Sequence, residues 1–172
     1  MNTIELIPCL RHHDKFITFA SSDCHDYFLN NRPDQFTLQI DPTIKLQTGQ
    51  SCGGHSSSWY IGLKEMVVEF ESLDNSPVNV KGGHITVDVF CSQVVGSNLA
   101  GRESNLLRRT TLFAANKRCK TLHVAFDSCQ MMQLRPKNLD RLDIVLRVVS
   151  PTNLSFALNS STLLTLQLSR LG

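Results

Sequence analysis

The stretch from Phe36 to Phe70 contains two runs in which apolar and polar residues alternate. The first begins at Phe36 with FTLQI, and the second begins at Trp59 with WYIGL, after a Gly/Ser-rich interruption at 49–58. A period of two places every second side chain on one face of a strand. The pattern therefore predicts two strands that each bury one face, separated by a surface loop. Any antiparallel sandwich could contain two such strands, so the pattern informs on fold and not on function.

The second run changes phase in the middle. Its apolar residues fall at Trp59, Ile61 and Leu63, and then on the other parity from Met66 onward, in MVVEF. One extra residue in a paired strand reverses the face of every side chain after it. We therefore expect a β-bulge near Lys64–Glu65 that keeps one face of the strand in the core. The single Trp, at the start of this run, is expected to be buried, because large aromatic side chains contribute most to a core.

Similar alternating runs recur along the whole chain, and no convincing amphipathic helix is present. The 172 residues suit one domain that is large enough to bury a core. About eight strands separated by turns predict a two-sheet sandwich, and a jelly roll is the sandwich that arranges eight strands in two packed sheets. The predicted fold is thus all-β: an irregular segment over 1–15, then a single jelly-roll β-sandwich of about eight antiparallel strands over 16–172. The expected strands are 16–20, 36–46, 59–70, 84–91, 106–113, 121–126, 142–150 and 162–169.

The intervening segments are expected to be irregular. Turn-forming residues predict loops at 29–35 and 96–105 and a turn at 151–153, and the connection that follows residue 126 is predicted to be long. None of these segments shows an alternation that would indicate a further strand.

Composition is that of a folded, globular protein. Hydrophobic residues make up 41% and charged residues 19%, and no apolar run approaches the roughly 20 residues of a membrane span. The N-terminal sequence lacks the apolar core of a signal peptide, so we expect an intracellular protein with reduced thiols and no membrane partner. The six cysteines are scattered without a CxxC pair, at Cys9, Cys24, Cys52, Cys91, Cys119 and Cys129.

The charge is unevenly placed along the chain. Residues 100–141 hold nine Lys/Arg and three Asp/Glu, a net of +6, so the remainder holds eight basic and twelve acidic residues, a net of −4. A basic segment can face nucleic acid or an acidic protein surface. This one has neither interleaved aromatic residues nor a continuous basic tail, so direct nucleic-acid binding is not expected. A solvated or subunit-facing patch is the preferred interpretation.

Motifs for catalysis are missing from the sequence. It contains no GxSxG, P-loop, HExxH or Rossmann fingerprint, and the paired carboxylates Glu65/Glu69 and Asp140/Asp143 occupy positions that exposed strands often give to acidic residues. We therefore expect neither an enzyme nor a bound cofactor.

One group of residues could in principle bind zinc, which needs four converging ligands. Their spacing matches no known arrangement of zinc ligand pairs, so a solvated N-terminal segment is preferred and no metal is expected. The residues are Cys9, His12, His13, Cys24 and His25.

Four stretches carry a likeness to a known family. FITFASSDCHDYFLNNRPDQFTLQIDPTIKL holds a strand, a Ser-rich turn, an Asn-containing spacer and a Phe-led strand that ends in apolar–Lys–Leu. WYIGLKEMVVEF is a Trp-led strand with Gly–Leu and Glu close behind. VDVFCSQVVGSNLAGRESNLLRRTTLF leads from a strand through Val–Gly and a loop to Leu–Leu–Arg, and LDIVLRVVSPTNLSFALNSSTLLTLQLSR holds a closing pair of strands around a turn and Phe156.

In this order and spacing, the stretches resemble the penton-type minor capsid proteins of Polinton-like elements and adintoviruses, relatives of the virophage and adenovirus vertex proteins. The resemblance extends from about Phe16 to Arg170. The sequence departs from the family pattern in four places. Pro151–Asn153 replaces a turn glycine, Gln167 replaces a leucine of the tail, Ser169 stands where a bulkier residue is common, and the Gly49–Ser58 loop is long.

The resemblance implies a single jelly-roll minor capsid protein, of which five copies form the icosahedral vertex of a virion that assembles inside the host cell. It implies as partners the other subunits of a homopentamer, the neighbouring major capsid protein, and a spike protein that could dock on the vertex. The basic segment and the acidic remainder could give neighbouring subunits complementary faces. The candidate interface residues are Arg102, Arg108, Arg109, Lys117, Arg118 and Lys120.

The alternative is a soluble lectin- or cytokine-like β-sandwich that binds a ligand. Such a module predicts a conspicuous pocket, or secretion with disulfides, and the sequence offers neither an aromatic platform nor a signal peptide. A cupin-like metal enzyme would need His and carboxylate ligands on facing strands, and His84 and His123 are the only histidines in the expected strands.

Overall fold

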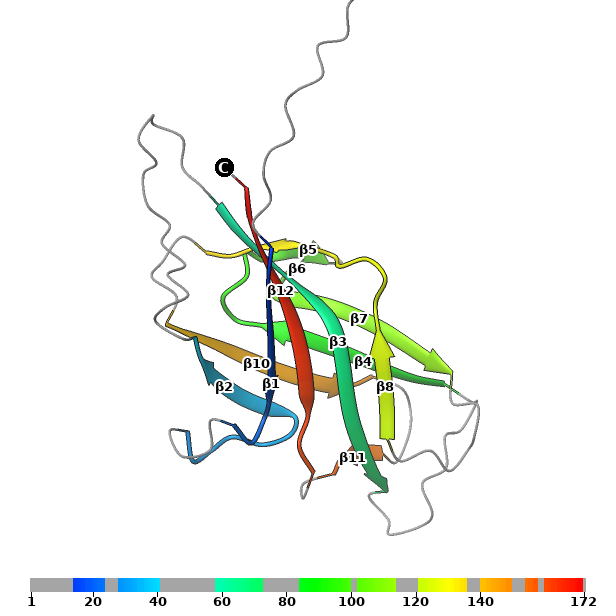
Figure 1. The fold of residues 1–172 in the computed structure, drawn as a ribbon. Helices are drawn as coiled ribbons and strands as arrows, with labels where there is room; N and C mark the ends of the chain where they lie inside the picture. The colour runs from blue at the N-terminus through cyan, green and yellow to red at the C-terminus, as the bar shows by residue number, and fades with distance from the viewer. Residues whose placement is uncertain are drawn as a thin grey trace, which may run out of the picture.

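The computed structural model describes residues 14–23, 28–40, 58–72, 84–99, 102–113, 121–135, 140–149, 154–157 and 160–171 (Figure 1). Every regular element within these ranges is a β-strand. The strands are β1 (Lys15–Ala20), β2 (Gln35–Gln39), β3 (Ser58–Ser72), β4 (His84–Cys91), β5 (Ser97–Leu99), β6 (Arg102–Ser104), β7 (Leu106–Phe113), β8 (Thr121–Ala125), β9 (Met132–Gln133), β10 (Arg141–Val148), β11 (Leu154–Phe156) and β12 (Leu163–Leu171).

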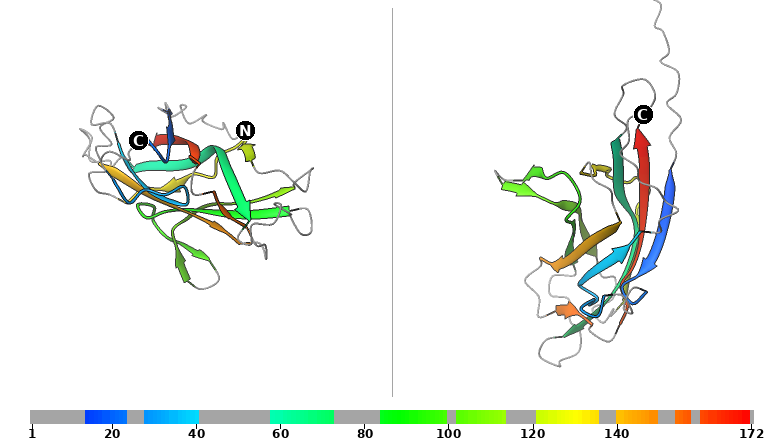
Figure 2. Two further views of the ribbon diagram at one scale, coloured as in Figure 1. Left: turned by 90° about the horizontal axis from the view of Figure 1, so that it is seen from below. Right: turned by 90° about the vertical axis from the view of Figure 1, so that its left-hand side faces the viewer.

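Eight of these strands form the two layers of a sandwich (Figures 1 and 2). Sheet I has the order β1-β12-β3-β8, with the short strands β9 and β11 also paired to β3, and sheet II has the order β2-β10-β4-β7. All the pairings are antiparallel. If the eight strands are counted in chain order, sheet I reads 1-8-3-6 and sheet II reads 2-7-4-5, which is the jelly-roll order. The prediction of an all-β jelly-roll sandwich is confirmed.

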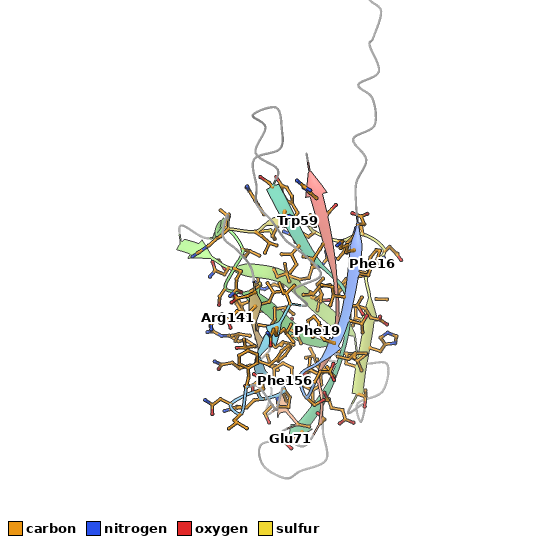
Figure 3. All side chains as sticks on the ribbon, turned by 60° about the vertical axis from the view of Figure 1, so that its left-hand side comes forward. Phe16, Phe19, Trp59, Glu71, Arg141 and Phe156 are labelled. Carbon is orange, nitrogen blue, oxygen red and sulfur yellow. The ribbon has the colours of Figure 1, made fainter. Side chains whose placement is uncertain are left out.

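The core lies between the two sheets, and most of its side chains come from the alternating rows of the predicted strands. Trp59, labelled in Figure 3, is 4% exposed and therefore buried as expected. Burying this apolar surface is the main favourable contribution to folding. The main contributors from the four central strands are Ile61, Leu63, Met66, Val68, Phe70, Ile85, Val87, Val89, Leu142, Ile144, Leu146, Leu164, Leu166 and Leu168.

The expected bulge in β3 is confirmed. Thr165 of β12 pairs with Glu65, whereas Leu166 pairs with Leu63, so Lys64 is the extra residue. The Lys64 backbone carbonyl accepts a hydrogen bond from the Phe126 N–H at 2.9 Å, and its ammonium donates to the Phe126 carbonyl at 2.7 Å. The bulge thus keeps the apolar row of β3 in the core and fixes the end of β8.

Four short strands were not predicted. β5 and β6 form a hairpin within the segment 96–105, which was expected to be a loop, and in Figure 2 this hairpin projects from sheet II away from sheet I. β9 lies in the connection that follows β8, and β11 begins directly after the expected turn at 151–153. Strands of two or three residues are too short to show alternation. They form because a partner strand lies beside them, which the local sequence does not reveal.

Candidate interaction surface

The strand order gives the sandwich two different flanks. Edge strands β1 and β2 lie on one flank, and edge strands β7 and β8 lie on the other (Figure 1). We call them the β1/β2 flank and the β7/β8 flank. Of the predicted basic interface residues, Arg108 and Arg109 lie on β7, at the second flank.

Arg109 lies on β7, on the outer face of sheet II, directly opposite Asp88 of β4. Its Nε and one terminal nitrogen each donate to the Asp88 carboxylate at 2.7 Å. The Asp88 side chain is only 6% exposed, while that of Arg109 is 51% exposed. The hydrogen bonds and negative charge of Asp88 raise the pKa of Arg109. This bidentate pair neutralises Asp88 and leaves the outer side of the guanidinium accessible to a further partner.

Arg108 also makes contacts within the subunit. Its guanidinium carbon lies 4.3 Å from the centre of the Phe126 ring, and a terminal nitrogen donates to the Ser128 carbonyl at 3.5 Å. A cation above an aromatic face is attracted by the negative face of the ring. Because Phe126 follows β8, this contact joins the edge of sheet II to the edge of sheet I at the β7/β8 flank.

One of the four remaining interface candidates lies among the described residues. Arg102 begins β6, beside the turn of the projecting hairpin, and β6 leads directly into β7. Lys117, Arg118 and Lys120 lie outside the described residues. The structure therefore brings Arg108 and Arg109 together on one strand and places Arg102 on the hairpin that precedes it.

The outer edge of β7 carries backbone groups that no strand of the described structure uses. The Thr86 carbonyl of β4 accepts from Val149 N–H on the β10 side, so the backbone of Thr86, and of Asp88 two residues on, faces β10. In an antiparallel pair, residues opposite such positions direct their own N–H and C=O away from the partner strand. Those residues are Thr111 and Arg109. Within the described ranges, no residue bonds to their backbone at this edge.

The edge of β2, at the opposite flank, is closed by the loop that precedes it. The Asn31 side-chain amide donates to the Thr37 carbonyl at 3.0 Å, and its oxygen accepts from Thr37 N–H at 2.8 Å. Arg32 and Gln35 exchange a pair of backbone hydrogen bonds of 2.8 and 3.1 Å. The sequence predicted only a loop over 29–35, since Asn, Pro and Asp are typical of any turn.

An open groove of about 560 Å³ lies along this closed edge, between the loop and the outer face of sheet II. Leu29, at 80% exposure, is part of its lining. Asp143 forms part of the wall, and its two oxygens accept from Thr37 Oγ1 at 2.9 Å and Gln93 Nε2 at 2.7 Å. The groove was not predicted, because its lining residues come from separate parts of the chain.

A row of hydrogen-bonded side chains crosses the outer face of sheet I. Thr18 on β1 bonds Thr165 on β12 at 3.0 Å, and Thr165 donates to Glu65 on β3 at 3.2 Å. The other Glu65 oxygen lies 2.6 Å from His123 Nε2 on β8. The hydrogen bond with His123, followed by that with Thr165, lowers the pKa of Glu65. Glu65 thus belongs to a structural row that spans four strands.

Glu69, the other acidic residue of the predicted pair on β3, accepts from Thr121 Oγ1 at 3.2 Å. Each glutamate therefore has its own partner on β8.

Two cysteines are described, and both are free thiols. Cys91 is buried, and this burial raises its pKa to about 11, so it stays protonated and unreactive at neutral pH. Across the described ranges, no three His, Cys, Asp or Glu side chains converge as metal ligands would. Cys9, His12, His13, Cys24 and His25 fall outside those ranges. None of the described segments forms a helix long and apolar enough to span a membrane.

No family model and no curated protein matches the sequence. A solved structure described as "Structure of infectious bursal disease virus Gt strain" aligns with 92% of this chain at 10% identity and a TM-score of 0.23. This chain covers 40% of the length of that one. A likeness this weak establishes neither a shared fold nor a shared function.

Proposed function

We propose that this chain is a viral structural protein, the minor capsid or penton subunit of which five copies close the icosahedral vertex. The observation that carries the proposal is the jelly-roll strand order, found in a chain whose sequence resembles penton-type capsid proteins from about residue 16 to 170. A fold alone does not identify a function, so the two observations count together.

The shape of the molecule is compatible with a closed ring. A cyclic assembly of identical subunits needs two different contact surfaces on each copy. The β1/β2 flank has an edge strand closed by its own loop, whereas β7 at the other flank has an edge that no described residue covers and carries Arg108 and Arg109. In this proposal Arg102, Lys117, Arg118 and Lys120 contact the neighbour directly, while Arg108 and Arg109 also hold their own flank together.

The proposed partners are the four other subunits, the neighbouring major capsid protein and a spike protein docked on the vertex. The proposed location is the capsid vertex of the virion, assembled inside the host cell. The role of the protein there is mechanical: it fills the five-fold position and holds the surrounding capsid subunits.

Native mass spectrometry and light scattering of the purified protein test the assembly. We expect pentamers, or a monomer–pentamer mixture that shifts toward monomer in high salt, because exposed charges are screened beyond about 10 Å at 0.1 M ionic strength. A stable dimer or trimer under all conditions would contradict the vertex assignment.

Charge reversal tests the role of the basic flank. Arg108→Glu and Arg109→Glu should each shift the mixture toward monomer, while Arg141→Glu, the same charge change on the exposed start of β10, serves as the matched control. Thermal unfolding of each variant separates lost assembly from lost folding, since both residues also make contacts within the subunit. Equal shifts for all three variants would contradict a specific role for the β7/β8 flank.

The groove favours one alternative, a lectin- or cytokine-like binding module. Such a module would bind a soluble ligand beside Phe28 and Asn30, which line the groove. A glycan array and a thermal-shift screen would then find a ligand whose binding is weakened by Asn30→Ala. Pentamer formation without any such ligand favours the capsid role.

A further inference from the structure

We infer that the N-terminal segment of one subunit adds as an extra strand to the open edge of β7 in the next subunit of the ring. This inference rests on the proposed function, because it describes how neighbouring copies of the pentamer would be joined. It assigns an occupant to the backbone groups that β7 leaves unused.

The open edge is suited to strand addition. β7 is eight residues long, and the N–H and C=O groups of Arg109 and Thr111 point away from β4. A peptide laid along this edge would form main-chain hydrogen bonds with both residues, as in other cases of β-augmentation. The side chains of Arg109 and Thr111 are exposed, so they leave the approach to this edge open.

The unpaired backbone groups of an exposed edge strand promote pairing with other chains. In the same sheet, the edge strand β2 is protected from such pairing by its own loop. There, Asn31 and Arg32 occupy the outward backbone groups of Thr37 and Gln35. No comparable contact reaches Arg109 or Thr111 from any segment that the structure describes. Since one edge of sheet II is closed and the other is open, the open edge marks where a further strand fits.

The segment before β1 has a sequence that fits this edge. Thirteen residues precede Asp14, and they include TIELI at Thr3–Ile7, followed by Pro8. Ile4 and Leu6 share one parity and would extend the apolar face of sheet II, and Glu5 has the other parity. On the outer face Glu5 would lie beside Arg109, and opposite charges on neighbouring strands attract.

The reach of the segment favours a neighbour over its own subunit. The seven steps from Ile7 to Asp14 span at most roughly 24 Å. Residue 14 leads into β1, which is diagonally opposite β7. A strand added beyond its own β7 lies four strand spacings and the thickness between the sheets away, a path around the sandwich of roughly 29 Å. In a head-to-tail ring the neighbour's β7/β8 flank faces this flank directly.

Two variants of the full-length chain test the inference from either side of the contact. Thr111→Pro removes an outward N–H that β4 does not use, and Thr111→Ala is its matched control. Ile4→Asp combined with Leu6→Asp changes only the segment that precedes the described residues. The proline and double-aspartate variants should each raise the concentration for half-dissociation of the pentamer about tenfold or more, as expected for the loss of one to two hydrogen bonds or an apolar contact. Thr111→Ala should stay within about twofold of the wild type.

Cross-linking identifies the occupant of the edge. A photo-reactive benzoylphenylalanine in place of Glu5, in pentamers mixed from ¹⁵N-labelled and unlabelled copies, should give adducts between light and heavy chains at 106–113. Adducts within one chain, or at another surface, would overturn the inference.

The outcomes separate the inference from the proposed function. Pentamers that neither the Thr111→Pro nor the double-aspartate variant weakens would overturn the strand addition and leave the vertex role standing. A wild-type chain that forms only dimers or trimers would overturn both. If Thr111→Pro fails to fold, the double-aspartate variant and the cross-link still test whether the N-terminal segment pairs with β7.

Discussion

The two edges of sheet II differ in what the chain does with their backbone groups. At β2, the preceding loop turns back so that Asn31 and Arg32 bond the outward groups of Thr37 and Gln35. At β7, Arg109 and Thr111 have no such cover in the described structure, and the adjacent side chains are instead paired across strands. The difference shows that a loop closes the edge of a sheet when it supplies hydrogen-bond partners to the outward backbone groups of the edge strand. Hydrogen bonds between side chains on neighbouring strands leave those backbone groups uncovered.

The segment 129–131 packs closely against Gly62 of β3. A Cβ at Gly62 would lie 2.7 Å from Met131 Sδ and 2.9 Å from Cys129 Cβ. Gly62→Val should therefore displace the segment 129–131 and lower the free energy of unfolding by about 3 kcal/mol, as overpacking does. Urea denaturation measures the change. Adding Met131→Ala should recover about 1 kcal/mol by shortening the facing side chain. A loss below about 0.5 kcal/mol in Gly62→Val would show that this segment is free to move.

Asn31→Ala should convert the closed β2 edge into an open one. Two hydrogen bonds to Thr37 are lost and its backbone groups meet water, so the free energy of unfolding should fall by about 2 kcal/mol. Amide hydrogen exchange at Thr37 should rise at the same time. Asn30→Ala, one residue earlier and exposed, is the control and should change stability by less than about 0.5 kcal/mol. Unchanged exchange at Thr37 would contradict the edge closure.

The row of side chains from Thr18 to His123 links the two flanks across sheet I. Replacing Glu65 in this row should change stability less than Gly62→Val or Asn31→Ala does. The lowered pKa of Glu65 means that its ionised form is favoured in the folded state, so its contribution is present above about pH 4.5 and is lost as the pH falls through the folded pKa. Thermal unfolding between pH 3 and 7 should show a slightly steeper acid loss for wild type than for Glu65→Gln. Glu71→Gln, on the same strand, should follow the wild type. If the melting temperatures of wild type and Glu65→Gln fell in parallel as the pH is lowered, ionised Glu65 would contribute nothing to stability.

The sequence by itself determined the all-β class, the main strands and the bulge at Lys64, because alternation reports which side chains must face a core. It predicted the burial of Trp59 for the same reason. It also placed basic residues at 102–120, although only Arg102, Arg108 and Arg109 of these candidates lie in the described structure.

Tertiary structure decided the rest. The partners of Arg108 and Arg109, the closure of β2 by Asn31 and the groove beside it all join residues that are distant in sequence or act through backbone direction. The same holds for β9 and β11, which are strands only because β3 runs beside them. The alternation of apolar and polar residues along a strand reveals which side chains are buried, because burial repeats with a period of two. A hydrogen-bond partner instead depends on which strands the fold brings together.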